Sequence, residues 1–132
     1  MPDRQPICIV IRIPNVALSR SDLEKALGRP LDRFEQPTNG TLAYAQIDVP
    51  GDRDQWTAAH DCVQSIHGAI QRLLSNGQIG SPYLDIAMAF PSSAYTMSLT
   101  MPALLIAAAG RSGMAVEISV YPTEADRESE NG

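Results

Sequence analysis

The sequence has only two cysteines, few aromatic residues and no long hydrophobic run. Cys8 and Cys62 lack the spacing of a zinc site and make a poor disulfide framework, so we expect both to be buried free thiols. The longest apolar runs, ICIVI from Ile7 and ALLIAAAG from Ala103, are far shorter than the roughly 18 residues that a membrane span requires. The N-terminal MPDRQP also lacks the basic and apolar regions of a signal peptide. We therefore expect a soluble, cytoplasmic protein.

Clustered positive charge is missing as well, which argues against a nucleic-acid-binding protein. The net charge is −5, and residues 122–132 contribute −3 of it through four carboxylates and one arginine. A polar segment of this kind, without aromatic residues, is typical of disorder. With 132 residues the chain is long enough for one ordinary hydrophobic core. We therefore expect a single α+β domain over residues 1–121 and a disordered acidic tail over residues 122–132.

The most regular pattern lies between Asp54 and Ser75. At about 100° per residue, its apolar side chains fall within one arc roughly 100 to 120° wide, which is the width of a core-facing helix stripe. These side chains are Trp56, Ala59, Val63, Ile66, Ile70, Leu73 and Leu74. Burying the single tryptophan with several branched side chains contributes on the order of ten kcal/mol before conformational entropy is subtracted. The pattern predicts a long helix at the centre of the core.

Other segments have the composition or the alternation of β-strands. They lie at residues 7–13, 41–49, 83–90 and 114–121. Residues 95–99 could add a brief fifth strand, whereas the turn-forming residues of 31–40 predict a loop. One short helix should end at Gly28 and another should begin after Thr100. The order predicts an α+β fold with a single, mostly antiparallel sheet of four or five strands and with one long and two short helices packed mainly on one face.

A catalytic or metal-binding pattern is missing from the sequence. His60 and His67 are seven residues apart on the long helix, about 10.5 Å along its axis, which is too far for one metal ion. Asp61 and Cys62 follow His60 directly, but adjacent helical residues point about 100° apart, so their adjacency predicts no His–Asp or Cys–His pair. We therefore predict no catalytic, metal-binding or cofactor-binding residues, and no cofactor.

Polar and aromatic positions within or beside the predicted strands are the candidates for a binding site. The positions that could line a concave sheet face, together with the loop at 31–40, are Tyr44, Gln46, Asp85, Tyr95 and Glu117. Ordinary solvent exposure of these side chains is the alternative. For a protein partner, the candidate anchor residues are Asp32, Phe34, Glu35, Tyr44, Asp85 and Tyr95.

Three segments form a wider pattern in the order LGRPLDRFEQPTNG, QWTAAHDCVQSIHGAIQRLLS and SLTMPALLIAAAGRSGMAVEISVYP. From Ile7 to Tyr121 the chain resembles small bacterial proteins of the domain-of-unknown-function family numbered four thousand two hundred and seventy-nine. The resemblance rests on Trp56, the Leu27–Gly28 pair, Tyr121 and the apolar spacing. It brings no established catalytic residues with it. Some members of that family resemble immunity proteins of bacterial polymorphic toxin systems, so the resemblance implies a protein that sequesters a toxin.

The residues and the resemblance together predict a non-enzymatic, cytoplasmic protein-binding domain, with toxin neutralisation by sequestration as its most specific form. The alternative is a small-ligand-binding regulatory module, followed by a small enzyme. The expected partner is another protein, such as a cognate toxin, rather than a nucleic acid or a membrane. Both a monomer and a homodimer fit the sequence.

Overall fold

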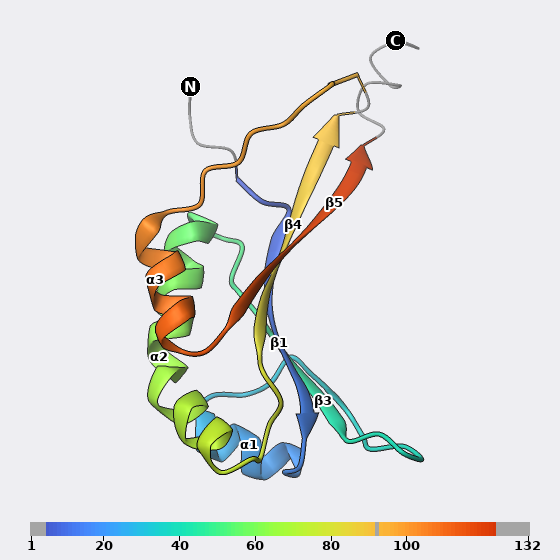
Figure 1. The fold of residues 1–132 in the computed structure, drawn as a ribbon, viewed down its shortest axis with the longest axis vertical. Helices are drawn as coiled ribbons and strands as arrows, with labels where there is room; N and C mark the ends of the chain where they lie inside the picture. Colours follow the sequence, from blue (N-terminus) through green and yellow to red (C-terminus); the bar gives the residue numbers. More distant parts are fainter. Residues whose placement is uncertain (1–4, 92, 124–132) are drawn as a thin grey trace.

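The computed structural model describes residues 5–91 and 93–123, which form one five-stranded sheet and three helices. In chain order the elements are β1 (Cys8–Val16), α1 (Arg20–Leu27), β2 (Arg33–Glu35), β3 (Ala43–Asp48), α2 (Gln55–Ser75), β4 (Tyr83–Pro91), α3 (Ala103–Arg111) and β5 (Ala115–Thr123). α2 and α3 run along one face of the sheet, α1 packs against α2, and none of the described helices covers the opposite face (Figure 1). This arrangement confirms the predicted α+β class.

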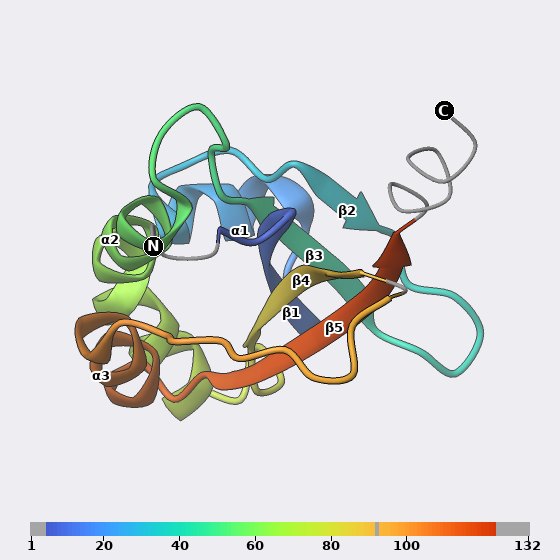
Figure 2. The ribbon, with the colours of Figure 1, turned by 90° about the horizontal axis from the view of Figure 1, so that it is seen from above.

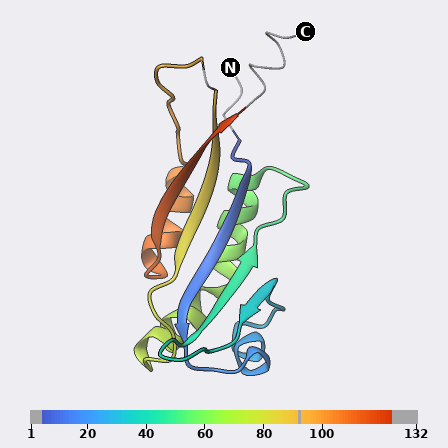
Figure 3. The same cartoon turned by 90° about the vertical axis from the view of Figure 1, so that its right-hand side faces the viewer.

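The strands follow the order β2-β3-β1-β4-β5 across the sheet (Figure 3). β1 is central and pairs antiparallel with β3 and β4, while β2 pairs antiparallel with β3. β5 pairs parallel with β4, because α3 carries the chain back along the helix-covered face before β5 begins. The sheet is therefore mostly antiparallel, as predicted, with one parallel pair at its edge.

The core lies between the sheet and the long helix α2. On the sheet side, Ile9, Ile11 and Ile13 of β1 are at most 1% exposed, and Trp56 at the start of α2 is 4% exposed. The predicted apolar stripe of α2 is buried at Trp56, Ala59, Val63, Ile66, Ile70 and Leu73, with Leu74 partly buried at its margin. α2 is therefore the centre of the core, as its apolar period predicts. None of the described helices combines the length and the apolar character that crossing a membrane requires.

The short helix α1 shows how local chemistry sets the ends of an element. Ser19 caps its N-terminus by accepting a hydrogen bond from the N–H of Asp22 at 3.1 Å. Gly28 ends the helix in the left-handed conformation, with φ of 73°, and its N–H donates to the carbonyl of Glu24. The Glu24 carboxylate then accepts from the N–H of Leu31 at 2.8 Å. These contacts direct the chain from α1 toward β2.

The fifth strand lies elsewhere than the sequence predicts. Residues 95–99 form no strand, whereas Arg33–Glu35, within the predicted loop at 31–40, pairs with β3. Three residues are too few for alternation to be recognised, and the turn formers that follow them dominate the local pattern.

Two strands extend beyond the ranges predicted for them, 7–13 and 114–121, and include the prolines that follow. β1 runs through Pro14 and Asn15, and its register against β3 shifts around Asn15, which has a φ of 51°. β5 includes Pro122 and Thr123, so the domain extends two residues into the predicted tail. β5 is an edge strand, and such a strand tolerates proline because one of its sides has no neighbouring strand to accept a hydrogen bond from an N–H. The rest of the predicted tail, residues 124–132, lies outside the described residues.

Candidate functional site

The uncovered side of the sheet is polar, because successive residues of a strand point to opposite faces. In β1, Ile11 and Ile13 face the helices, so Arg12 between them points to the uncovered side. The register places Arg12 opposite Gln46 of β3 and Tyr83 of β4. We call this surface the open sheet face. Its polar residues are Arg12, Arg33, Glu35, Tyr44, Gln46, Asp48, Tyr83, Asp85, Glu117 and Ser119.

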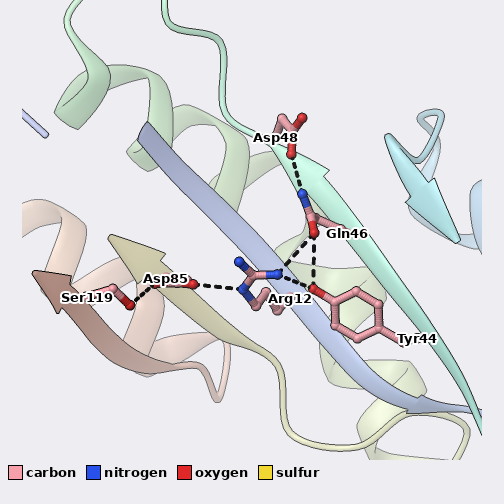
Figure 4. A network of polar contacts seen from close by, with 6 residues as sticks. All are labelled: Arg12, Tyr44, Gln46, Asp48, Asp85 and Ser119. Carbon is pink, nitrogen blue, oxygen red and sulfur yellow. Dashed lines mark hydrogen bonds and ion pairs between the residues drawn. The ribbon is translucent and has the colours of Figure 1, made fainter. Parts of the chain in front are cut away.

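Arg12 is the centre of a hydrogen-bond network on the open sheet face (Figure 4). Its Nε donates to Oδ2 of Asp85 at 2.8 Å, in an ion pair whose side chains are 30% and 12% exposed. Its Nη1 donates to the hydroxyl of Tyr44 and, at 3.1 Å, to Oε1 of Gln46. From β5, the hydroxyl of Ser119 donates to Oδ1 of Asp85 at 2.9 Å. The network therefore links β5, β4, β1 and β3.

The network continues along β3 and reaches the segment before β2. The Tyr44 hydroxyl donates to Oε1 of Gln46 at 3.2 Å, and Nε2 of Gln46 donates to Oδ1 of Asp48 at 2.8 Å. The backbone N–H of Asp48 donates in turn to Oδ2 of Asp32 at 2.7 Å. These bonds connect the polar side chains of β3 to one another and to Asp32.

The surroundings of the network change the pKa of Arg12 and of the neighbouring Tyr83. Partial burial disfavours the charged form of Arg12, but its hydrogen bonds with Tyr44 and Asp85 outweigh this cost and raise its pKa above the ordinary value. Burial also raises the pKa of Tyr83, although the nearby charge of Arg12 opposes this effect. Near neutral pH, Arg12 is therefore a cation and Tyr83 is a neutral hydrogen-bonding group.

An open hollow of about 270 Å³ lies over the network. The residues that line it are Arg12, Arg33, Glu35, Tyr44, Tyr83, Asp85 and Glu117. Beside it, Arg33 and Glu35 of β2 form an exposed ion pair at 2.8 Å. Over the whole open sheet face, four carboxylates face two guanidinium groups, a net charge of −2. The surface can therefore donate and accept hydrogen bonds, with an excess of acidic groups for ion pairing.

Three of the six predicted partner-binding residues lie together on this face. Glu35, Tyr44 and Asp85 all line the hollow, and Asp85 also forms the ion pair with Arg12. Asp32 lies at the border of the face, where its carboxylate accepts a hydrogen bond from the backbone N–H of Asp48 in β3. The structure thus brings half of the predicted set into one site.

The other two predicted residues, Phe34 and Tyr95, lie away from the hollow. Phe34 points to the helix side of the sheet, because its neighbours in β2 point to the open sheet face, and it packs against the core. Tyr95 follows β4 and is completely exposed, at 101%. Cys8, the first residue of β1, pairs with Ala87 of β4, so the end of β4 and Tyr95 lie beyond the start of β1. Tyr44 lies beside the last residues of β1. Tyr95 and Tyr44 are therefore at opposite ends of the sheet.

Three hollow-lining residues, Arg12, Arg33 and Tyr83, were not among the predicted ones. A signal existed for Arg12, because it is the single charged residue in the run ICIVIRI and has the opposite parity to the three isoleucines that face the core. Arg33 lies in a segment that was predicted to be a loop, so no parity could be assigned to it. Tyr83 is the first residue of its strand, where alternation gives little information.

The two cysteines differ in exposure, which corrects the prediction that both are buried. Cys62 is buried in α2, and Nη1 of Arg29 donates to its Sγ at 2.9 Å. Cys8 is exposed, because in β1 it has the parity of Arg12 and points to the uncovered side of the sheet.

The histidines also depart from the prediction in one respect. His60 Nδ1 lies 3.2 Å from Oδ1 of Asp61, so the two adjacent residues do form a pair at the helix surface. This pair and the ion pair with Arg53 lower the pKa of Asp61. His67 is paired elsewhere, with Nδ1 at 3.0 Å from the hydroxyl of Ser112. Within residues 5–91 and 93–123, no group of three or more His, Cys, Asp and Glu side chains is placed to hold a metal ion.

A second, smaller hollow of about 190 Å³ lies where α2 and α3 begin. Its lining combines apolar and polar groups from both helices and from the N-terminal segment. The lining residues are Gln5, Asp54, Trp56, Thr57, His60, Pro102, Leu104 and Leu105. Asp54 accepts a hydrogen bond from the Thr57 hydroxyl at 2.7 Å, which is the main cause that lowers its pKa.

Comparisons with protein-family models, with curated proteins and with solved structures gave no match to this chain. The resemblance to the domain-of-unknown-function family therefore stays a prediction from the residues that suggest it.

Proposed function

We propose that this chain is a non-enzymatic protein-binding domain that recognises a basic surface of another protein through its open sheet face. The observation that carries this proposal is the network around Arg12, in which side chains from four strands are held by hydrogen bonds across an uncovered sheet. Because hydrogen bonds restrain these side chains, a partner that binds them causes a smaller loss of conformational entropy than it would on a surface without such bonds. The face is thus suited to specific polar recognition.

The charge of the open sheet face favours a basic partner. Asp85 is paired with Arg12 in a largely buried contact, whereas the ion pair of Glu35 with Arg33 is exposed and Glu117 is exposed at the border of the hollow. Lysine and arginine side chains of a partner could pair with these two carboxylates, and the excess of acidic groups would accelerate the encounter. A basic toxin that is sequestered by an immunity-type protein is the most specific partner of this kind, and it is the one that the family resemblance suggests.

A small-ligand-binding regulatory module is the second candidate. The observation in its favour is the partly apolar hollow between α2 and α3, lined by Trp56 and Leu105. Its volume of about 190 Å³ is below the roughly 300 to 1,000 Å³ that is common for ligand pockets. The hollow on the open sheet face is larger, but it is open and polar. Because the partly apolar hollow is small and the hollow on the open sheet face is open and polar, we favour protein binding over ligand binding.

The test uses two double variants that change the net charge equally. Glu35→Gln with Glu117→Gln removes two accessible carboxylates of the open sheet face, whereas Asp22→Asn with Asp52→Asn removes two exposed carboxylates elsewhere. A partner is first isolated from the native organism with the wild-type protein, and association rates are then measured at about 50 and 500 mM salt. We expect the open-face variant to associate about tenfold more slowly at low salt and to differ little at high salt.

Equal slowing in both double variants would contradict recognition by the open sheet face, since only the overall charge would then matter. Retention of a small metabolite, without any protein, would favour the regulatory-module reading instead. Substituting Leu104→Lys at the border of the second hollow distinguishes that case, because it should abolish metabolite binding and leave the open sheet face unchanged.

A further inference from the structure

β5 forms an edge of the sheet whose outer side has no strand beside it among the described residues (Figure 2). The backbone N–H of Ala115 donates to the carbonyl of Pro82 just before β4. The N–H and C=O groups of a strand alternate in direction, so the odd-numbered residues of β5 face β4. Val116, Ile118 and Val120 therefore direct their backbone groups toward the free edge.

The same three residues expose apolar side chains. They lie on the helix side of the sheet, next to fully buried residues of β4, yet Val116, Ile118 and Val120 are 38%, 44% and 50% exposed. Ile106 of α3 is 51% exposed. Leu104 of α3 lines the second hollow together with residues of α2. Ile106 follows Leu104 by two residues, so it points to the opposite flank of α3. β5 runs on that flank (Figure 2). Natural edge strands are often protected by charges or prolines, but between Val116 and Val120 the single charged residue of β5 is Glu117, and Pro122 lies beyond this stretch.

We propose that two copies of this chain form a dimer in which the β5 strands pair antiparallel and extend the sheet to ten strands. This inference goes beyond the proposed function and does not depend on it. In such a pair the residues with free backbone groups meet as hydrogen-bonded pairs. A β-branched side chain then meets a β-branched side chain across the junction, which is a favourable combination in sheets.

The sequence of β5 selects one register for this pairing, centred on Ile118. A register centred on Glu117 would place two carboxylates opposite each other, which is unfavourable. A register centred on Ser119 would place Val116 opposite Pro122, which has no N–H to donate. With Ile118 opposite itself, Val116 pairs with Val120 of the second copy, and neither problem arises. This register keeps three hydrogen-bonded residue pairs in the ladder.

The size of the surface indicates a dimer of moderate strength. The exposed parts of Ile106, Val116, Ile118 and Val120 amount to roughly 300 Å² of apolar surface per copy. A standard interface buries about 800 Å² per partner, so the backbone edge and the polar side chains of β5 would have to supply the remainder. The dimer therefore lies at the lower end of specific interfaces and depends on protein concentration. In this geometry both open sheet faces lie on the same side of the extended sheet.

The first measurement is sedimentation velocity of the wild-type chain over about 1 to 500 µM, where we expect a reversible monomer–dimer equilibrium. Ile118→Lys places a charge at the centre of the junction and should shift the chain to monomer, weakening association by at least about tenfold. Leu104→Lys is the matched control, because it removes an exposed apolar side chain of α3 on the flank away from β5. Thermal unfolding of both variants verifies that each is folded.

The second measurement tests the register by disulfide formation in a Cys8→Ser background, which removes the exposed native thiol. In Ile118→Cys the two introduced residues face each other, with Cα atoms about 5.5 Å apart, within the range that a disulfide spans. In Val116→Cys the corresponding residues are offset by four positions, about 13 Å along the strand, so no cross-link should form. We expect a cross-linked dimer from Ile118→Cys alone. A wild-type chain that stays monomeric, a dimer that Ile118→Lys does not weaken, or cross-linking through Val116→Cys would each overturn the proposal.

Discussion

The ion pair between Arg12 and Asp85 should contribute measurably to stability, unlike most ion pairs at protein surfaces. The perturbation is a double-mutant cycle of Arg12→Ala, Asp85→Ala and the combined variant. Such a cycle removes the separate costs of losing each side chain and isolates their interaction. The result decides whether the network of the open sheet face is held together as the structure indicates.

The magnitude follows from distance and exposure. Two unit charges about 4 Å apart attract by about 4 kcal/mol at an effective dielectric constant near 20, before desolvation and screening are subtracted. Exposed pairs retain about 0.2 to 1 kcal/mol, whereas breaking a buried pair costs about 3 to 5 kcal/mol. With side chains 30% and 12% exposed, this pair is intermediate. We therefore expect a coupling free energy of about 1 to 2 kcal/mol, and a loss of about 2 to 3 kcal/mol for Asp85→Ala alone.

The assay is urea unfolding followed by the fluorescence of Trp56, the single tryptophan, which is buried in the folded state. The pair between Arg53 and Asp61 is a matched control, because its N–O distance is also 2.8 Å but both side chains are 52% exposed. Its coupling free energy should be much smaller than that of the Arg12 pair. Equal coupling in the two cycles would refute the reasoning, since burial would then have no influence.

Four further predictions concern the core, the backbone, the thiols and metal content. Trp56→Ala should lower the free energy of unfolding by about 3 to 5 kcal/mol, measured by circular dichroism in urea, and an unchanged midpoint would contradict its place in the core. Gly113→Ala should lower the thermal midpoint, because φ is 73° and the new Cβ would lie 3.1 Å from a leucine methyl of α2, whereas Gly110→Ala, in open space within α3, should leave it equal or higher. Cys8 should react rapidly with a thiol reagent at about pH 8, and Cys62 slowly, because burial raises its pKa and leaves little thiolate until the pH rises further; equal rates would contradict this difference. Elemental analysis of the purified protein should give less than about a tenth of an equivalent of zinc or iron.

The parts of the fold that repeat a pattern over many residues were predictable from the sequence. The 21 residues of α2 repeat their apolar period several times, so both its position and its buried side are evident. The nine-residue strand β4 alternates long enough to be recognised in the same way. β2 has three residues, and its pairing with β3 depends on tertiary contacts that no local pattern contains. The parallel pairing of β4 with β5 likewise follows from the path of α3 rather than from either strand.

The candidate site was predictable only in part, because it depends on which strands are neighbours. The alternation within β3 and β4 assigns Tyr44 and Asp85 to polar sides of their strands. Their meeting at Arg12 requires β1 to lie between those two strands, and Arg12 and Asp85 are separated by 73 residues in the chain. The order of strands is a global property of the fold. The alternation of residues along each strand therefore identifies members of the network, but it does not predict how they are arranged relative to one another.

The open sheet face and the β5 edge can be tested independently, because they use different residues and opposite sides of the same strand. In β5, Glu117 and Ser119 belong to the open sheet face, whereas Ile118 has its side chain on the helix side and its backbone at the free edge. Ile118→Lys should therefore separate the copies and leave the hollow around Arg12 unchanged. If the partner binds one hollow at a time, this variant keeps its intrinsic affinity. If one partner contacts both hollows of a dimer, its apparent affinity should fall by an order of magnitude or more in Ile118→Lys, because the second contact is no longer at high effective concentration. Titration of the partner against wild type and Ile118→Lys, above and below the dimer dissociation constant, distinguishes these two modes of binding.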